Sequence, residues 1–201
     1  MIIGLEGVSC TGKTTLALEL TDHLRNAQIV PCYYHAAPDP RVLYRREIHC
    51  EEDQLAVLAT HLEVEGLRQR QASAAMDLGC CVILDRTVDT LLAHVRAVGA
   101  LNGLDANQDA RALVDDQIKR GRVAVPSVTL LLCADHELVA ARASARIAMP
   151  TLYYDAGFTR AFQAHFAAPV APVCLVINAD APVAEVAEKA YGLLRPYLDG
   201  E

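Results

Sequence analysis

One run of residues near the start of the chain constrains its fold more than any other feature. Residues 7–14, Gly-Val-Ser-Cys-Thr-Gly-Lys-Thr, fit the pattern G-x-x-x-x-G-K-[ST]. The apolar stretch 1–5 before it predicts a short buried strand, and leucines at 16, 20 and 24 after it predict a helix. Strand, glycine loop and helix form the context that this pattern requires. We therefore expect a phosphate-binding loop. The alternative, a plain glycine turn, needs neither the lysine nor the threonine.

The chemistry of such a loop is anion capture. Glycines let successive backbone N–H groups point into one concavity at a helix N-terminus, whose dipole favours negative charge. We expect Lys13 to reach the β- and γ-phosphates of a nucleotide and the Thr14 hydroxyl to ligate Mg²⁺. Cys10 is interpreted as a small loop filler in preference to a redox residue. The residues expected to bind the nucleotide are Gly7, Ser9, Cys10, Thr11, Gly12, Lys13, Thr14 and Thr15.

Composition limits the other classes of function. The chain has 201 residues, 53% of them hydrophobic, which predicts a single globular domain over 1–201. A net charge of −7 without a basic cluster argues against a nucleic acid polymer as partner. No apolar run approaches the ~20 residues of a membrane span, and a strand that begins at residue 2 leaves no room for a signal peptide. Seven cysteines without metal-ligand spacing fit a reducing, cytoplasmic location.

Apolar runs and helical periodicities alternate along the chain, which predicts an α/β fold with a parallel sheet. Pro31 favours an edge position for the second strand, and a polar loop over 35–41 follows it. The expected strands are 1–5, 28–34, 80–84, 128–133 and 173–177. The expected helices are 15–24, 51–78, 87–101, 106–120, 135–146, 155–166 and 184–198.

Several stretches resemble the thymidylate kinases. Residues 5–15 are similar to the I-E-G-x-D-G-x-G-K-[ST]-T opening of that family, and residues 82–87 to its strand with an Asp-Arg motif. Residues 125–132 resemble its P-D-L-T strand. The related deoxynucleoside kinases share this layout, with Glu-Arg-Ser in place of Asp-Arg. The resemblance implies a three-layer P-loop NTPase fold, with about five parallel strands flanked by helices.

The same resemblance implies a helical lid over about 142–154. Arg142 and Arg146 fall where the lid helix of the family carries arginines, and residues four apart share one face of a helix. Two guanidiniums on one face suit a clamp on the transferring phosphate. A solvated basic face is the alternative.

The chain also departs from the family. Ser9 stands in place of the aspartate of the phosphate loop, Cys10 in place of a glycine, and Thr87 in place of the tyrosine of Asp-Arg-Tyr. Ser127 replaces the aspartate of P-D-L-T, and the arginine of A-A-D-R has no clear counterpart in 58–63. The resemblance therefore carries over the fold and the phosphoryl chemistry but leaves the acceptor open.

Asp85 ends an apolar strand that should lie beside the first strand, where ligands of open α/β sheets bind. Its carboxylate can hold Mg²⁺ or accept a proton from the acceptor; the alternative is an N-cap for a helix that begins at Thr87. Arg86 is expected to bind the acceptor, as in the kinases that the chain resembles, or else to form an ion pair in the core. Asp135 is interpreted as a helix cap in preference to a ligand.

The acceptor site is the least determined part. Asp39, in Pro38-Asp39-Pro40, is equally interpreted as a turn residue or as a base, near where the family carries an acidic-proline dipeptide. Aromatic residues at the end of the second strand and directly after it are expected either to pack or to stack on a base. The arginines beyond them are expected either to hold a phosphate or to be solvated. These residues are Tyr33, Tyr34, His35, Arg41, Arg45 and Arg46.

The sequence thus predicts an ATP- and Mg²⁺-dependent phosphotransferase acting on a nucleoside or nucleoside monophosphate, with Lys13, Asp85, Arg86, Arg142 and Arg146 as catalytic residues. A kinase for a sugar or a hydroxylated secondary metabolite is the alternative. A GTPase-type switch is disfavoured because we find no N-K-x-D motif. Kinases of this type are often dimers, so a homodimer is one candidate assembly, and the partner is otherwise a small molecule.

Overall fold

The computed structural model describes residues 1–44, 47–146 and 150–198. Arg45, Arg46 and the middle of the expected lid, 147–149, lie outside the described residues. Five parallel strands form one sheet in the order β2-β3-β1-β4-β5. Their bounds are β1 Ile2–Glu6, β2 Ala27–Val30, β3 Cys81–Asp85, β4 Val128–Cys133 and β5 Cys174–Asn178.

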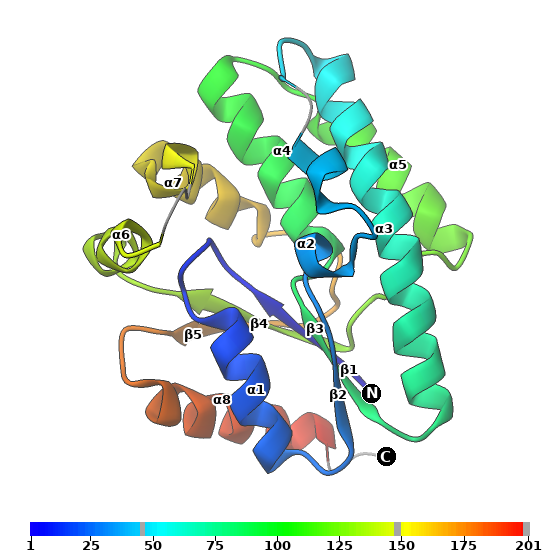
Figure 1. The fold of residues 1–201 in the computed structure, drawn as a ribbon, viewed down its shortest axis with the longest axis vertical. Helices are drawn as coiled ribbons and strands as arrows, with labels where there is room; N and C mark the ends of the chain where they lie inside the picture. The colour runs from blue at the N-terminus through cyan, green and yellow to red at the C-terminus, as the bar shows by residue number, and fades with distance from the viewer. Residues whose placement is uncertain (45–46, 147–149, 199–201) are drawn as a thin grey trace.

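Helices cover both faces of this sheet (Figure 1), which makes the three layers that the sequence predicted. Helices α1 and α8 lie on one face, and α3, α4 and α7 lie on the other (Figure 1). The helices are α1 Lys13–His23, α2 Tyr33–Ala36, α3 Glu51–Asp77, α4 Val88–Asn102, α5 Asn107–Lys119, α6 His136–Ser144, α7 Ala156–His165 and α8 Val183–Leu198, with 3₁₀ turns η1 Pro40–Tyr44 and η2 Thr151–Tyr154. No helix in the described ranges is long and apolar enough to cross a bilayer.

Alternation along the strands builds the two halves of the core. Ile3 and Leu5 of β1 pack toward α1 and α8, while Ile2 faces the layer that contains α3. Gly4, between them, has no room for a side chain, because a Cβ there would lie 2.6 Å from Thr87 Cγ2. This close approach brings the start of α4 against β1.

The second strand is shorter than expected. The sequence predicted a strand over 28–34, but β2 ends at Val30 and the chain turns into α2 at Tyr33. Pro31 has no N–H for a ladder, and the Cys32 carbonyl accepts hydrogen bonds from the amides of His35 and Ala36. The strand lies at the edge of the sheet, as Pro31 indicated. The expected polar loop after it is largely taken up by α2 and η1.

Candidate functional site

The phosphate loop lies between β1 and α1, at the carboxyl end of the central strand. Lys13 Nζ points back into it and donates to the carbonyl oxygens of Gly7 (2.8 Å) and Val8 (2.7 Å). Gly7 is required by its backbone and its surroundings: φ is +135°, and a Cβ would lie 2.4 Å from the Leu132 carbonyl oxygen. The loop thus holds a lysine ammonium where a phosphate would lie.

The protein alone does not stabilise the charged form of Lys13 well. Burial, together with the charge of Arg86, lowers the pKa of Lys13 to about 7, although Asp85, Glu6 and Cys10 act in the opposite direction. An anion bound in the loop would stabilise the ammonium form. The electrostatics therefore favour a strongly anionic ligand.

Thr14, in the first turn of α1, faces the end of β3. Its Oγ1 donates to Asp85 Oδ2 at 2.6 Å, and Asp85 is 3% exposed. The parallel register places Asp85 beside Leu5 of β1, which confirms that its strand neighbours the first strand. The alternative of Asp85 as a helix cap is wrong, because α4 is capped by Thr87, whose side chain accepts from the Asp89 amide.

A hydroxyl and a carboxylate oxygen are ligands of the kind that Mg²⁺ takes in nucleotide sites, where substrate phosphates and water supply the rest. The described residues contain no group of three or more His, Cys, Asp or Glu side chains that could hold a metal. Thr14 and Asp85 therefore fit a metal that arrives with a nucleotide and do not fit a metal bound by protein alone.

Arg86 points back toward the phosphate loop. It adopts a left-handed backbone with φ of +70°, which is unusual for a residue with a Cβ. Its Nη2 lies 3.3 Å from Ser9 Oγ, and its Nη1 lies 3.4 Å from the Gly7 carbonyl oxygen. Within the described ranges no ion pair involves Arg86, which disfavours the interpretation as a core ion pair.

Glu6, which the sequence analysis did not single out, ties the end of β1 to the start of α4. Its carboxylate accepts from the amide and hydroxyl of Thr87, both at 2.7 Å, and from the amide and hydroxyl of Thr90. Burial raises the pKa of Glu6, and the hydrogen bond from Thr90 opposes this. A carboxylate with these donors is a structural acceptor that fixes the segment after β3.

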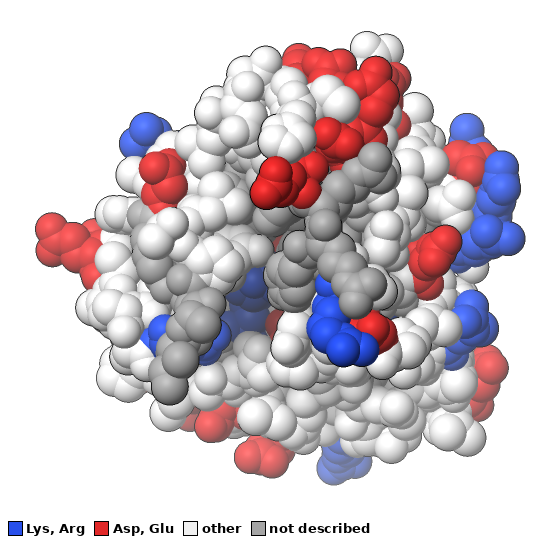
Figure 2. All heavy atoms as spheres, turned by 45° about the horizontal axis from the view of Figure 1, so that its top comes forward, with Lys and Arg blue, Asp and Glu red and all other residues white. Residues whose placement is uncertain are grey.

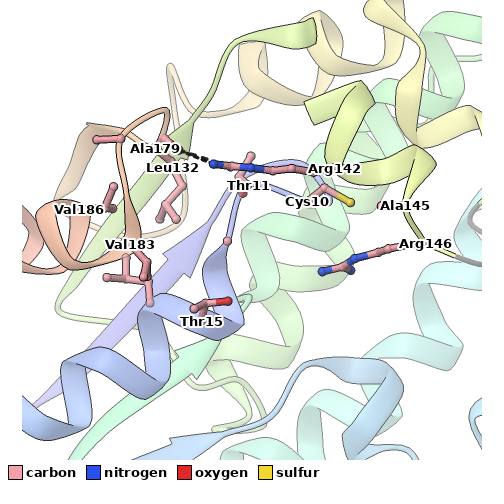
Figure 3. Close-up of a pocket in the computed structure, with 13 residues that line it drawn as sticks. Cys10, Thr11, Thr15, Leu132, Arg142, Ala145, Arg146, Ala179, Val183 and Val186 are labelled. Carbon is pink, nitrogen blue, oxygen red and sulfur yellow. Dashed lines mark hydrogen bonds between the residues drawn. The ribbon is translucent and has the colours of Figure 1, made fainter. Parts of the chain in front are cut away.

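A cavity of about 410 Å³ opens beside the phosphate loop (Figure 3). Arg142 and Arg146 reach into it from α6 and the residues that follow (Figure 3), and both guanidinium Nη atoms of Arg142 lie 3.4 Å from the Ala179 carbonyl oxygen. Helix α6 ends at Ser144, so the two arginines share the cavity and not one helix face. The apolar side of the cavity is formed by Leu16, Leu132, Ala181, Val183 and Val186.

Asp135 does not line this cavity. Its side chain accepts from the Glu137 amide at the start of α6, which confirms the interpretation as a helix cap.

A hollow lies on the face that carries the ends of the strands, and Figure 2 shows Lys and Arg atoms set back inside it. Rings also gather near Arg86. Burial lowers the pKa of His94 to about 4, with smaller contributions from the charges of His61 and Arg86. The centroid of the His94 ring lies 6.1 Å from that of Tyr153 and 5.5 Å from that of Phe158. These rings form one cluster of uncharged side chains, which we call the ring wall. The sequence did not predict it, because helical histidines carry no periodic pattern.

His61 has a defined role in this wall. Its Nδ1 lies 2.9 Å from the Val57 carbonyl oxygen, so Nδ1 carries the proton and Nε2 is left as an acceptor. Burial lowers the pKa of His61, which keeps the ring neutral near pH 7. The ring of Tyr33 lies 6.0 Å away, centroid to centroid.

The other expected acceptor residues lie at the surface beyond β2. Tyr34 is 47% exposed. Asp39 accepts from Arg41 through a two-point contact, with Oδ1–Nε at 2.8 Å and Oδ2–Nη2 at 3.0 Å. His35 lies near Cys32, with 3.3 Å between Nδ1 and Sγ. Tyr33 alone among the aromatic candidates is buried.

The chain has the three-layer fold of the P-loop nucleoside and nucleotide kinases. A thymidylate kinase from Candida albicans aligns with a TM-score of 0.70 at 15% identity, covering 100% of this chain and 93% of the other. A deoxyadenosine kinase from M. mycoides with bound dATP aligns with a TM-score of 0.70 at 17% identity, over 97% of this chain and 100% of the other. The same kinase with dCMP and dCDP gives 0.67 at 16%, over 98% of this chain and 100% of the other. At these identities the likeness defines the fold. No protein-family model and no curated protein matches the sequence.

Proposed function

We propose that this protein is an ATP-dependent phosphotransferase that moves the γ-phosphate of ATP to a nucleoside or nucleoside monophosphate. One observation carries the proposal: Lys13, the Thr14–Asp85 pair and the cavity that Arg142 and Arg146 line all converge at the loop after the central strand. Phosphoryl transfer requires little beyond positioning and charge neutralisation, and this arrangement supplies both.

The donor nucleotide occupies the cavity. Its phosphates lie on the phosphate loop, and its base lies against the apolar side beside Val183 and Val186. ATP is favoured over GTP because we find no N-K-x-D motif that would read guanine.

Each charged residue has a role in the transfer. Mg²⁺, held by Thr14 and Asp85, would supply charge neutralisation between the phosphates. Lys13 holds the β- and γ-phosphate oxygens, and the guanidiniums of Arg142 and Arg146 neutralise the charge that spreads over the transferring group.

The acceptor binds on the hollowed side next to Arg86. The uncharged rings of His61 and His94 there suit a planar acceptor with hydrogen-bonding groups, and a nucleobase is such an acceptor. Arg86 contacts the phosphate loop, and from there it can hold the acceptor against the transferring phosphate.

The test measures ADP release from Mg·ATP against a panel of nucleosides, nucleoside monophosphates, sugars and hydroxylated secondary metabolites. Lys13→Ala, checked for folding by circular dichroism, is the blank. We expect turnover with a nucleoside or nucleotide, abolished by Lys13→Ala. If only a sugar or a hydroxylated secondary metabolite is phosphorylated, the proposed nucleoside or nucleotide acceptor is wrong. GTP hydrolysis that needs no acceptor would instead identify a switch protein.

A further inference from the structure

We infer that Arg68 is a positioning residue, which sets the geometry of Asp85 and Arg86 from beneath the site. Arg68 lies on α3, is fully buried, and pairs with an equally buried Glu65 through a 2.6 Å contact between Nη1 and Oε2. Its remaining hydrogen bonds go to backbone carbonyl oxygens. Nε donates to the Pro31 carbonyl oxygen at 2.9 Å, and Nη2 donates to the carbonyl oxygens of Asp85 (3.2 Å) and Arg86 (2.5 Å).

These acceptors belong to two strand ends. Pro31 follows β2, and Asp85 is the last residue of β3, so one guanidinium joins both strands to α3. Only a planar fork with several fixed N–H groups reaches three carbonyl oxygens and a carboxylate at once. A lysine in the same place has one nitrogen to serve all of them.

The contact to Arg86 falls where the backbone most needs support. A φ of +70° is unfavourable for a residue with a Cβ, and it persists where surrounding contacts fix it. The Arg86 amide is held by the Leu5 carbonyl oxygen at 3.0 Å, and its carbonyl oxygen is held by Arg68. The residue is thus fixed on both sides, which directs its side chain toward Ser9 and Gly7.

The surroundings of the pair point to geometry as its role. The Arg68 guanidinium lies 4.3 Å from the centroid of the Tyr33 ring, and Glu65 Oε1 accepts from the Ala124 amide at 3.1 Å. Buried ion pairs contribute little net stability compared with well-packed apolar residues. Because Arg68 donates hydrogen bonds to the backbone of Asp85 and Arg86, we infer that the pair serves to order this segment.

The consequence for catalysis rests on the proposed kinase function. Without the fork, the carbonyl oxygens of Asp85 and Arg86 lose their donor, and the Arg86 amide is left to hold the segment at this point. The Asp85 carboxylate and the Arg86 guanidinium then lose their alignment with the phosphate loop. Misplacement by about 1 Å lowers kcat by about a hundredfold. The affinity for ATP without Mg²⁺ should change little, because Arg68 contacts none of the cavity residues.

Arg68→Lys tests the proposal, since it keeps the charge beside Glu65 and removes the fork. We expect kcat to fall by about a hundredfold, while the Kd of ATP measured by calorimetry without Mg²⁺ stays within about threefold. We also expect exchange of the Arg86 and Thr87 amides to accelerate by about tenfold or more relative to the rest of the sheet. Asp89→Asn is the matched control. Asp89 is equally buried and accepts from His165 and the Val170 amide, so its loss lowers stability while kcat stays near the parental value.

If Arg68→Lys does not fold, the double variant Glu65→Leu/Arg68→Met still tests the proposal, because it removes both buried charges together. It should fold and show the same loss of kcat and the same local exchange. Parental kcat with unchanged exchange in either folded variant would overturn the proposal, as would unfolding of both. Exchange at Arg86 and Thr87 is read without substrate, so a protein that proves not to be a kinase still tests the positioning role.

Discussion

The Thr14 hydroxyl donates a 2.6 Å hydrogen bond to Asp85 Oδ2 across 71 positions of sequence, and it thereby joins the first turn of α1 to the end of β3. Both groups are oxygen ligands of the kind that Mg²⁺ prefers. In a nucleotide site the same two oxygens would turn from each other toward the metal. The pair is therefore the place where we propose that Mg²⁺ binds with the nucleotide.

Asp85→Asn should lower kcat by about two to three orders of magnitude and shift the Mg²⁺ concentration needed for half-maximal rate upward, because the amide is a weaker metal ligand. Mg²⁺ titration of steady-state ADP release measures both. Asp135→Asn is the matched control, since Asp135 also follows a strand but caps α6, and asparagine caps as well as aspartate. Parental kcat for Asp85→Asn would leave the carboxylate without a role in metal or proton transfer.

Lys13→Ala should abolish turnover and leave the fold intact. Within the described ranges, the Lys13 ammonium bonds to the phosphate loop alone, to the carbonyl oxygens of Gly7 and Val8 and the hydroxyl of Thr11. Steady-state ADP release and thermal unfolding together measure the two effects. Turnover within about tenfold of the parent would contradict the assignment of this loop to phosphate binding.

ATP binding should depend on pH through Lys13. Its pKa is lowered to about 7 in the free protein, and a bound triphosphate raises it by favouring the ammonium. Below pH 7 the lysine is already charged, so binding takes up no proton at this group. Above pH 7 each binding event takes up a proton, and the Kd of ATP should rise by up to about tenfold per pH unit.

Calorimetry at pH 8 in two buffers with different ionisation heats measures this proton uptake. Lys13→Met removes the titrating group and serves as control, so its proton uptake should be that of ATP alone. Equal uptake by the parent and Lys13→Met would contradict a lysine that is charged by the nucleotide.

Arg142→Ala and Arg146→Ala should each lower kcat more than they weaken ATP binding, because their charge matters most when the phosphate is in transfer. Loss of one such donor typically lowers kcat by about 10²–10³. Comparison of kcat with the calorimetric Kd of ATP separates the effects. Arg111→Ala on α5, which removes an exposed pair with Asp115, is the control. If both single variants keep the parental kcat, Arg142 and Arg146 do not act on the transferring phosphate, and they form a solvated basic surface instead.

The sequence predicted what depends on local pattern. The phosphate loop, the alternation of strands and helices, the edge position of β2 and the cap at Asp135 all follow from neighbouring residues, and the structure confirms the last three of these. The end of β2 was predicted wrongly because apolar residues after Pro31 serve a helical turn as well as a strand. Tertiary contacts, and not periodicity, decide between the two.

The buried polar groups behind the site could not be predicted in this way. Glu6 meets Thr87 across 81 positions, and Arg68 meets the Arg86 carbonyl oxygen across 18. A lone Glu or Arg within an apolar segment gives no periodic pattern, and its partner is defined only when the sheet order brings strand ends together. Departures from the local pattern at Glu6 and Arg68 are the one feature that could have drawn attention to them.

Arg86→Ala should separate the acceptor from the donor. The guanidinium contacts Ser9 and Gly7 of the phosphate loop, and its charge adds to the effects of burial and of His61 that lower the pKa of His94 in the ring wall. If Arg86 holds the acceptor, its loss raises the acceptor KM or lowers kcat by about 10²-fold, while the Kd of ATP stays nearly constant. Its loss also removes a positive charge beside Lys13, which favours the charged lysine and works against any weakening of ATP binding. Titration of ATP and then of acceptor against Arg86→Ala separates these outcomes. A variant that binds ATP poorly and keeps its acceptor KM would place Arg86 on the donor side, and the two sites proposed above would then be reversed.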